Sequence, residues 1–137
     1  MPFRFEFDSV NKILLLRFEG RLTEASFAEG YRAIRTYSTA TDAHAGIWDL
    51  SSVTEFALSP EFISHVASVG PAMPDPTRRP RFLVAPPMLG LSVSRVVEIT
   101  EGYENPLFRI VLSVNEAFAV LGVQSPQFEP LSLATQG

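Results

Sequence analysis

The chain has 137 residues, a length typical of one domain with a hydrophobic core. Its net charge of −4, from 11 basic and 15 acidic side chains, argues against general nucleic-acid binding. It has no cysteine, which excludes disulfides and thiolate-based metal or catalytic sites. Its first residues do not resemble a signal peptide, and no apolar run is long enough to span a membrane, so we expect a cytoplasmic protein.

Two adjacent strands are expected at the start of the chain. Aromatic and charged residues alternate strictly over 3–8, which is the period of a half-buried strand. A polar turn over 9–12 separates this strand from a second one over Ile13–Glu19, which Gly20 ends. The short connection predicts an antiparallel hairpin.

The pattern then changes to the helical period. Thr23 is a suitable N-cap, and Phe27, Tyr31 and Ile34 follow at the spacing of one buried helical stripe. The polar residues 39–44 are expected to connect this helix to the next strand.

A short strand buried on both faces is expected over Ala45–Leu50, because this segment is apolar without alternation. We expect a loop over Ser51–Leu58. A second helix should start at Ser59, followed by Pro60 and Glu61, and stop at Gly70: a capping hydroxyl, a proline at the first helical position and an acidic residue all favour a helix start.

The rest of the chain repeats the alternation of strand and helix. After a proline-rich connection over 70–80, the sequence predicts a two-sided strand over Arg81–Ala85, a third helix over Leu91–Glu101 and a last strand over Arg109–Leu112.

A fourth helix is expected after the last strand. Ser113 and Glu116 have the spacing of a capping box, and Gly122 has the character of a helix end. Residues 123–137 show no periodicity and are expected to form an extended or mobile tail.

The order ββαβαβαβα predicts one α/β domain over 1–122, with a mainly parallel sheet and helices packed on it. This order, together with Asp49-Leu50-Ser51-Ser52-Val53 after the two-sided strand, resembles the bacterial anti-sigma-factor-antagonist (STAS) domain family. The resemblance covers about residues 3–122. It implies a non-enzymatic regulatory or protein-interaction module in a bacterial cytoplasm.

The family's phosphorylation motif, Asp-Ser-x-Gly, is absent from the matching stretch. Ala57 stands where the acidic residue belongs, Leu58 where the phosphorylated hydroxyl belongs, and Pro60 where the glycine belongs. Ser59 is the hydroxyl nearest to that position. The sequence therefore predicts that the family's phosphorylation switch is lost.

Candidate binding residues gather where the strands end, since ligands of open parallel sheets bind outside the carboxyl ends of the strands. The candidates for ligand or partner binding are Asp49, Ser51, Ser52, Ser59 and Arg95. The alternative is structural: Asp49 accepts backbone N–H groups in its own turn, and Ser59 and Ser113 cap helices.

No catalytic residue, cofactor or metal is expected. His44 and His65 have no partner at metal-ligand spacing, and the nucleotide-binding glycine patterns are missing. The alternative function is a small-molecule or lipid-binding domain with a pocket between sheet and helices, as in the related CRAL-TRIO architecture. The sequence leaves open the identity of the partner and whether the chain forms a homodimer.

Overall fold

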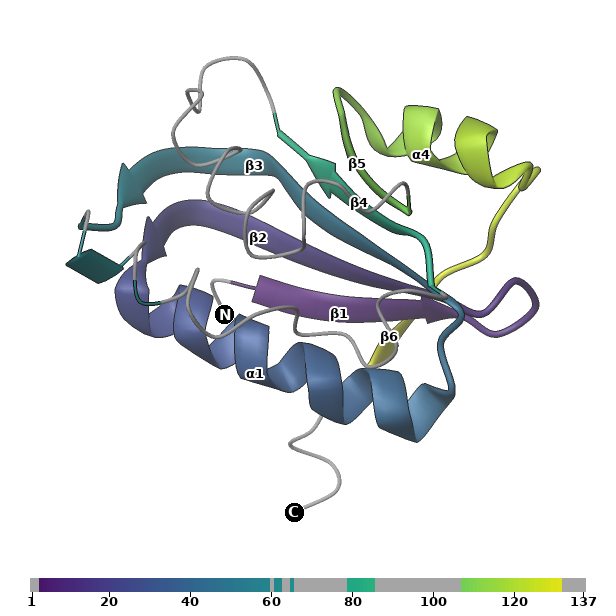
Figure 1. The fold of residues 1–137 in the computed structure, drawn as a ribbon, viewed down its shortest axis with the longest axis horizontal. Coiled ribbons are helices and arrows are strands. Elements are labelled where there is room, and N and C mark those ends of the chain that lie inside the picture. Colours follow the sequence, from purple (N-terminus) through teal and green to yellow (C-terminus); the bar gives the residue numbers. More distant parts are fainter. Residues whose placement is uncertain (1–2, 60, 63–64, 66–78, 86–106, 132–137) are drawn as a thin grey trace.

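The computed structural model describes residues 3–59, 61–62, 65, 79–85 and 107–131. They form a six-stranded sheet in the order β5-β4-β3-β2-β1-β6, with the helices α1 and α4 beside it (Figure 1). The elements are β1 (Phe3–Asp8), β2 (Ile13–Thr23), α1 (Glu24–Thr41), β3 (Ala45–Ala57), β4 (Arg81–Val84), β5 (Phe108–Val111), α4 (Val114–Leu121) and β6 (Glu129–Leu131).

The sheet is mixed. β2, β3, β4 and β5 run parallel to one another, whereas β1 is antiparallel to both β2 and β6. The α/β class and the hairpin of β1 and β2 are confirmed. The expected third helix over Leu91–Glu101 lies outside the described residues, as does most of the expected second helix.

Each face of the sheet has its own apolar core. On one face, Leu16 and Trp48 pack with Ile34 and Tyr37 of α1. On the other face, apolar side chains of β2, β3, β4 and β5 pack with Ala117 of α4. The two helices therefore cover opposite faces, and strands with buried residues on both sides, such as β4, lie between them.

β2 and β3 are longer than expected. β2 continues through Gly20 to Thr23, and the expected loop over Ser51–Leu58 is instead the second half of β3. Two register shifts between these strands each place one extra residue in β3. They bring Leu50, Val53 and Phe56 to the α1 side at a spacing of three residues, which does not resemble the alternation of a regular strand.

The start of α1 is confirmed and its end lies later than expected. The Thr23 side chain accepts a hydrogen bond from the backbone N–H of Ser26, and the Ser26 hydroxyl accepts one from the N–H of Thr23. The helix includes residues expected in the polar connection and ends at Thr41, where Asp42 adopts a left-handed conformation (φ 53°).

Both ends of α4 follow the sequence signals. The Ser113 hydroxyl accepts from the N–H of Glu116, and Gly122 ends the helix with φ 71°. The Glu116 carboxylate accepts from the N–H of Leu112 (2.9 Å) rather than from Ser113 itself. The preceding strand, β5, begins and ends one residue earlier than expected.

The chain after Gly122, expected as a tail, returns to the sheet. β6 pairs with β1, and Phe128 stacks on Phe118 of α4. The buried carboxylate of Asp8 holds this segment in place by accepting from the N–H of Gln127 (3.3 Å). The folded unit therefore extends beyond residue 122, at least to Leu131.

Candidate functional site

The candidate binding residues that the structure describes lie in two separate places. Asp49 lies opposite Arg17 of β2 and Val84, the last residue of β4. Because β3 continues from there to Ala57, Ser59 follows the far end of the strand, roughly 20 Å or more away at about 3.3 Å per residue. Arg95 lies outside the described residues.

Asp49 has a structural environment. Its side chain is only 3% exposed, and its Oδ1 accepts a hydrogen bond from the N–H of Ser51 (2.9 Å). Its Oδ2 lies 3.9 Å from Nη1 of Arg17, whose Nε lies 3.0 Å from Oε2 of Glu6. This row of charges crosses three strands and keeps the buried carboxylate paired.

The second halves of β2 and β3 form an arm. Glu19–Thr23 pairs with Ser52–Ala57 at the left of Figure 1, next to the start of α1. Three exposed side chains of β3 lie there, Ser52, Thr54 and Glu55, and a fourth, Ser51, lies directly before them; we call these four the arm surface. Glu55 is paired with Arg21 (Oε2–Nε 3.2 Å), whereas Val53 of the same strand is buried.

Ser59 is held by two groups at the end of the arm. Its hydroxyl accepts a hydrogen bond from the N–H of Phe62, as expected of a helix cap. Its own N–H donates to the carboxylate of Glu24, in the first turn of α1 (2.8 Å). Hydrogen bonds from the Ser59 N–H and then from its hydroxyl lower the pKa of Glu24, so this carboxylate is ionised at neutral pH.

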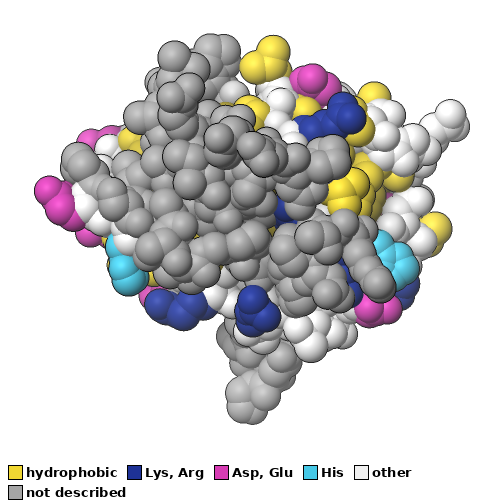
Figure 2. All heavy atoms as spheres, viewed as in Figure 1, with side chains coloured by type: hydrophobic (Ala, Val, Ile, Leu, Met, Phe, Trp, Pro, Cys, Tyr) yellow, Lys and Arg dark blue, Asp and Glu magenta, His cyan; other side chains and the backbone are white. Residues whose placement is uncertain are grey.

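The histidines lie apart. Figure 2 shows the two histidine side chains at opposite sides of the view, so they do not share a site. His44 is exposed beside Asp42, with Nε2 3.7 Å from Oδ2. Within the described ranges, no three His, Cys, Asp or Glu side chains are grouped to hold a metal ion. Nor is any helix in that part of the chain long and apolar enough to cross a membrane.

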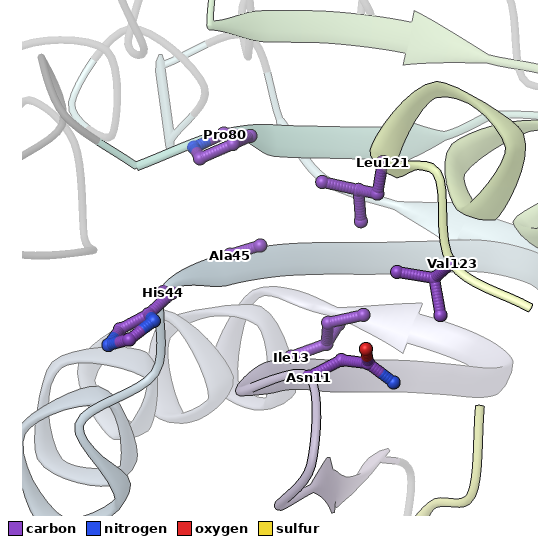
Figure 3. A pocket seen from close by; sticks show the side chains of 7 residues that line it. All are labelled: Asn11, Ile13, His44, Ala45, Pro80, Leu121 and Val123. Carbon is purple, nitrogen blue, oxygen red and sulfur yellow. The ribbon is translucent and has the colours of Figure 1, made fainter.

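An open pocket lies at the other end of the sheet, where β2, β3 and β4 begin (Figure 3). Its volume is about 500 Å³, and it is lined by Asn11, Ile13, His44, Ala45, Pro80, Leu121 and Val123. Sequence reasoning missed this pocket because its residues come from four segments that only the fold brings together. The pocket lies at the amino ends of the strands, whereas the candidates from the sequence lie at the carboxyl ends.

Comparisons with known proteins do not assign the chain to a family. No protein-family model matches it, and no curated protein shows significant sequence similarity to it.

Proposed function

We propose that this chain is a non-enzymatic protein-interaction module of the STAS type, and that its partner binds the arm surface. The exposed strand face of Ser51, Ser52, Thr54 and Glu55 carries this proposal, because it presents polar side chains on a firmly anchored backbone. We expect the protein to act in a bacterial cytoplasm.

The anchoring comes from the opposite face of the arm. Val53 is 3% exposed, and Leu22 of β2, which pairs with Phe56, is 1% exposed; both belong to the core beneath α1. Phe56 packs against the same core. A partner that binds this strand therefore meets a fixed surface and loses little affinity to ordering it.

The strand pairing supports the resemblance to the STAS family but does not assign the chain to that family. An antiparallel β1 beside four parallel strands, with α1 crossing from β2 to β3, fits the element order that the resemblance implies, whereas β6 beyond β1 is not part of that order. The segment Asp49–Val53 lies at the base of the arm. In the family the phosphorylation motif follows this stretch, at the positions of Ala57 to Pro60, so the resemblance implies a regulatory surface at the arm.

The contact between Ser59 and Glu24 bears on how binding is controlled. The hydroxyl and N–H of Ser59 are both engaged, and a carboxylate already lies beside them. A phosphate added at Ser59 would meet the negative charge of Glu24 at close range. We therefore expect partner binding to be constitutive or gated by a ligand.

Co-purification from the native cells tests the proposal. The tagged wild-type chain is compared with Ser52→Arg, which adds bulk and charge to the arm surface, and with the matched control Ser9→Arg. Ser9 is exposed in the turn between β1 and β2, at the other end of the sheet.

The expected result is one protein, or a second copy of this chain, retained by wild type and Ser9→Arg and reduced at least about tenfold with Ser52→Arg. An identical set of retained proteins for all three chains would contradict the arm surface. Unfolding curves of the three chains establish that the comparison is between folded proteins.

A further inference from the structure

Five of the seven side chains that line the pocket at the start of β2, β3 and β4 are apolar: Ile13, Ala45, Pro80, Leu121 and Val123. Ile13 and Ala45 belong to the core on the α4 side and are almost fully buried. Leu121 and Val123 pack against the same core from the end of α4. Pro80 completes the wall at the start of β4.

The end of α4 explains why this part of the core is not covered. Gly122 takes up a left-handed conformation, and its N–H and that of Val123 bond back to the last turn of the helix. The helix therefore ends at Leu121, above the first residues of β2 and β3, and the chain turns away at Val123. The opening of about 500 Å³ lies within the range of small-molecule sites.

A hydrogen-bond acceptor of fixed orientation lies at the mouth of the pocket. The Asn11 side-chain nitrogen donates to Oδ2 of Asp8 (2.8 Å), and Asp8 is itself 1% exposed. This bond fixes the amide, so its oxygen is the end that remains for a ligand. Figure 3 shows that oxygen turned toward Val123 and the nitrogen turned away.

The second polar residue at the mouth is His44. Its ring lies beside the carboxylate of Asp42, which also lies 4.0 Å from Nη2 of Arg79. Asp42 and Arg79 carry opposite charges at this outer edge, so the pocket has no strong preference for an anion. The amide oxygen of Asn11 is then the group that selects among ligands of similar shape.

From this geometry we infer that the pocket binds a small molecule with an apolar body and an N–H donor, either an amide or an amine. The apolar body lies against Ala45, Leu121 and Val123, and the N–H group donates to Oδ1 of Asn11. This site is independent of the arm surface, because it lies at the opposite ends of β2 and β3.

Three probes that share one ring test the inference: benzamide, benzylamine and benzoate. Each is titrated into the isotope-labelled full chain while backbone amide shifts are followed by NMR. Benzamide or benzylamine should shift the amides of Asn11, Ala45 and Val123 with a Kd on the order of 1 mM, and benzoate should bind at least about tenfold more weakly. The stronger of the first two probes distinguishes an amide ligand from an amine.

A pair of adjacent variants on α4 provides the control. Leu121→Phe fills the pocket and should weaken binding about tenfold, whereas Val120→Phe, at an exposed position of the same helix, should leave it unchanged. If Leu121→Phe does not fold, Val123→Phe takes its place. Equal binding of benzoate, shifts only in residues away from the pocket, or equal effects of the two variants would overturn the inference.

Discussion

Ser59 and Glu24 are joined by a hydrogen bond of 2.8 Å between the backbone N–H of Ser59 and the carboxylate of Glu24. The bond connects the start of α1 to the helical residues around Phe62, because Glu24 is the first residue of α1 and the Ser59 hydroxyl accepts from the N–H of Phe62. It also places a carboxylate beside Ser59, which is the hydroxyl closest to the position of the family's phosphorylated residue.

We therefore predict that Ser59 carries no phosphate in the native cells. A kinase would have to break the cap and place a charge of about −2 beside an ionised carboxylate. Intact-mass measurement and site mapping on the isolated protein check this. Substantial phosphate on Ser59 would restore the family's switch, whereas phosphate at Ser125 or Ser132 would leave the prediction standing.

The Trp48 side chain is 5% exposed in the core beneath α1. Trp48→Ala should lower the free energy of unfolding by about 3–5 kcal/mol, measured by urea denaturation. Its indole N–H has no hydrogen-bond partner within the described part of the chain, so Trp48→Phe should cost clearly less. Val10→Ala, at an 85% exposed position, is the control. Equal midpoints for Trp48→Ala and the control would show that the core is wrongly assigned.

The cap at Ser113 predicts a smaller effect. Ser113→Ala removes the acceptor for the N–H of Glu116 and should cost about 0.5–2 kcal/mol of stability. Ser113→Asp, which keeps an acceptor at the cap, should recover most of it. Thermal or urea unfolding measures both variants, and a loss in Ser113→Asp as large as in Ser113→Ala would indicate that the hydroxyl is not acting as a cap.

Asp8 predicts a pH dependence. Burial raises its pKa, but hydrogen bonds from Asn11, Val10 and Gln127 outweigh burial, and the pKa lies below its ordinary value of 3.8. A lowered pKa in the folded state means that the carboxylate stabilises the fold above the pKa of the unfolded chain, and that this contribution disappears as the pH falls through the folded value.

Asp8→Ala should therefore cost about 1–3 kcal/mol at pH 7, and the difference from wild type should shrink below about pH 4. Urea denaturation at pH 7, 5 and 3 measures it, with the exposed Glu29→Ala as control. A difference that stays constant down to pH 3 would show that the Asp8 charge is not involved.

Local signals in the sequence predicted much of the fold. The alternation over 3–8 identified β1, and Thr23, Ser113 and Gly122 marked helix ends, because caps and turns depend on residues within a few positions. The second half of β3 was missed for a physical reason. Its two bulges place Leu50, Val53 and Phe56 on one face at intervals of three, so the two-residue period is lost.

Features made by distant residues could not be predicted in this way. β6 has three residues, one of them Pro130, and is a strand only because β1 offers a free edge. The same holds for the candidate site: the sequence predicted that this strand ends at Leu50, next to Asp49, but β3 continues to Ala57, and Ser59 therefore lies at the far end of the arm.

Site-specific photo-crosslinking tests the central claim most directly. A photoreactive amino acid is placed at position 52, in the arm surface, and in a second sample at position 9, in the turn between β1 and β2. The proposed interaction module predicts that illumination of native cells joins position 52 to one defined protein, or to a second copy of this chain, and that position 9 gives no such product. The same products from both positions, or none from position 52, would contradict it.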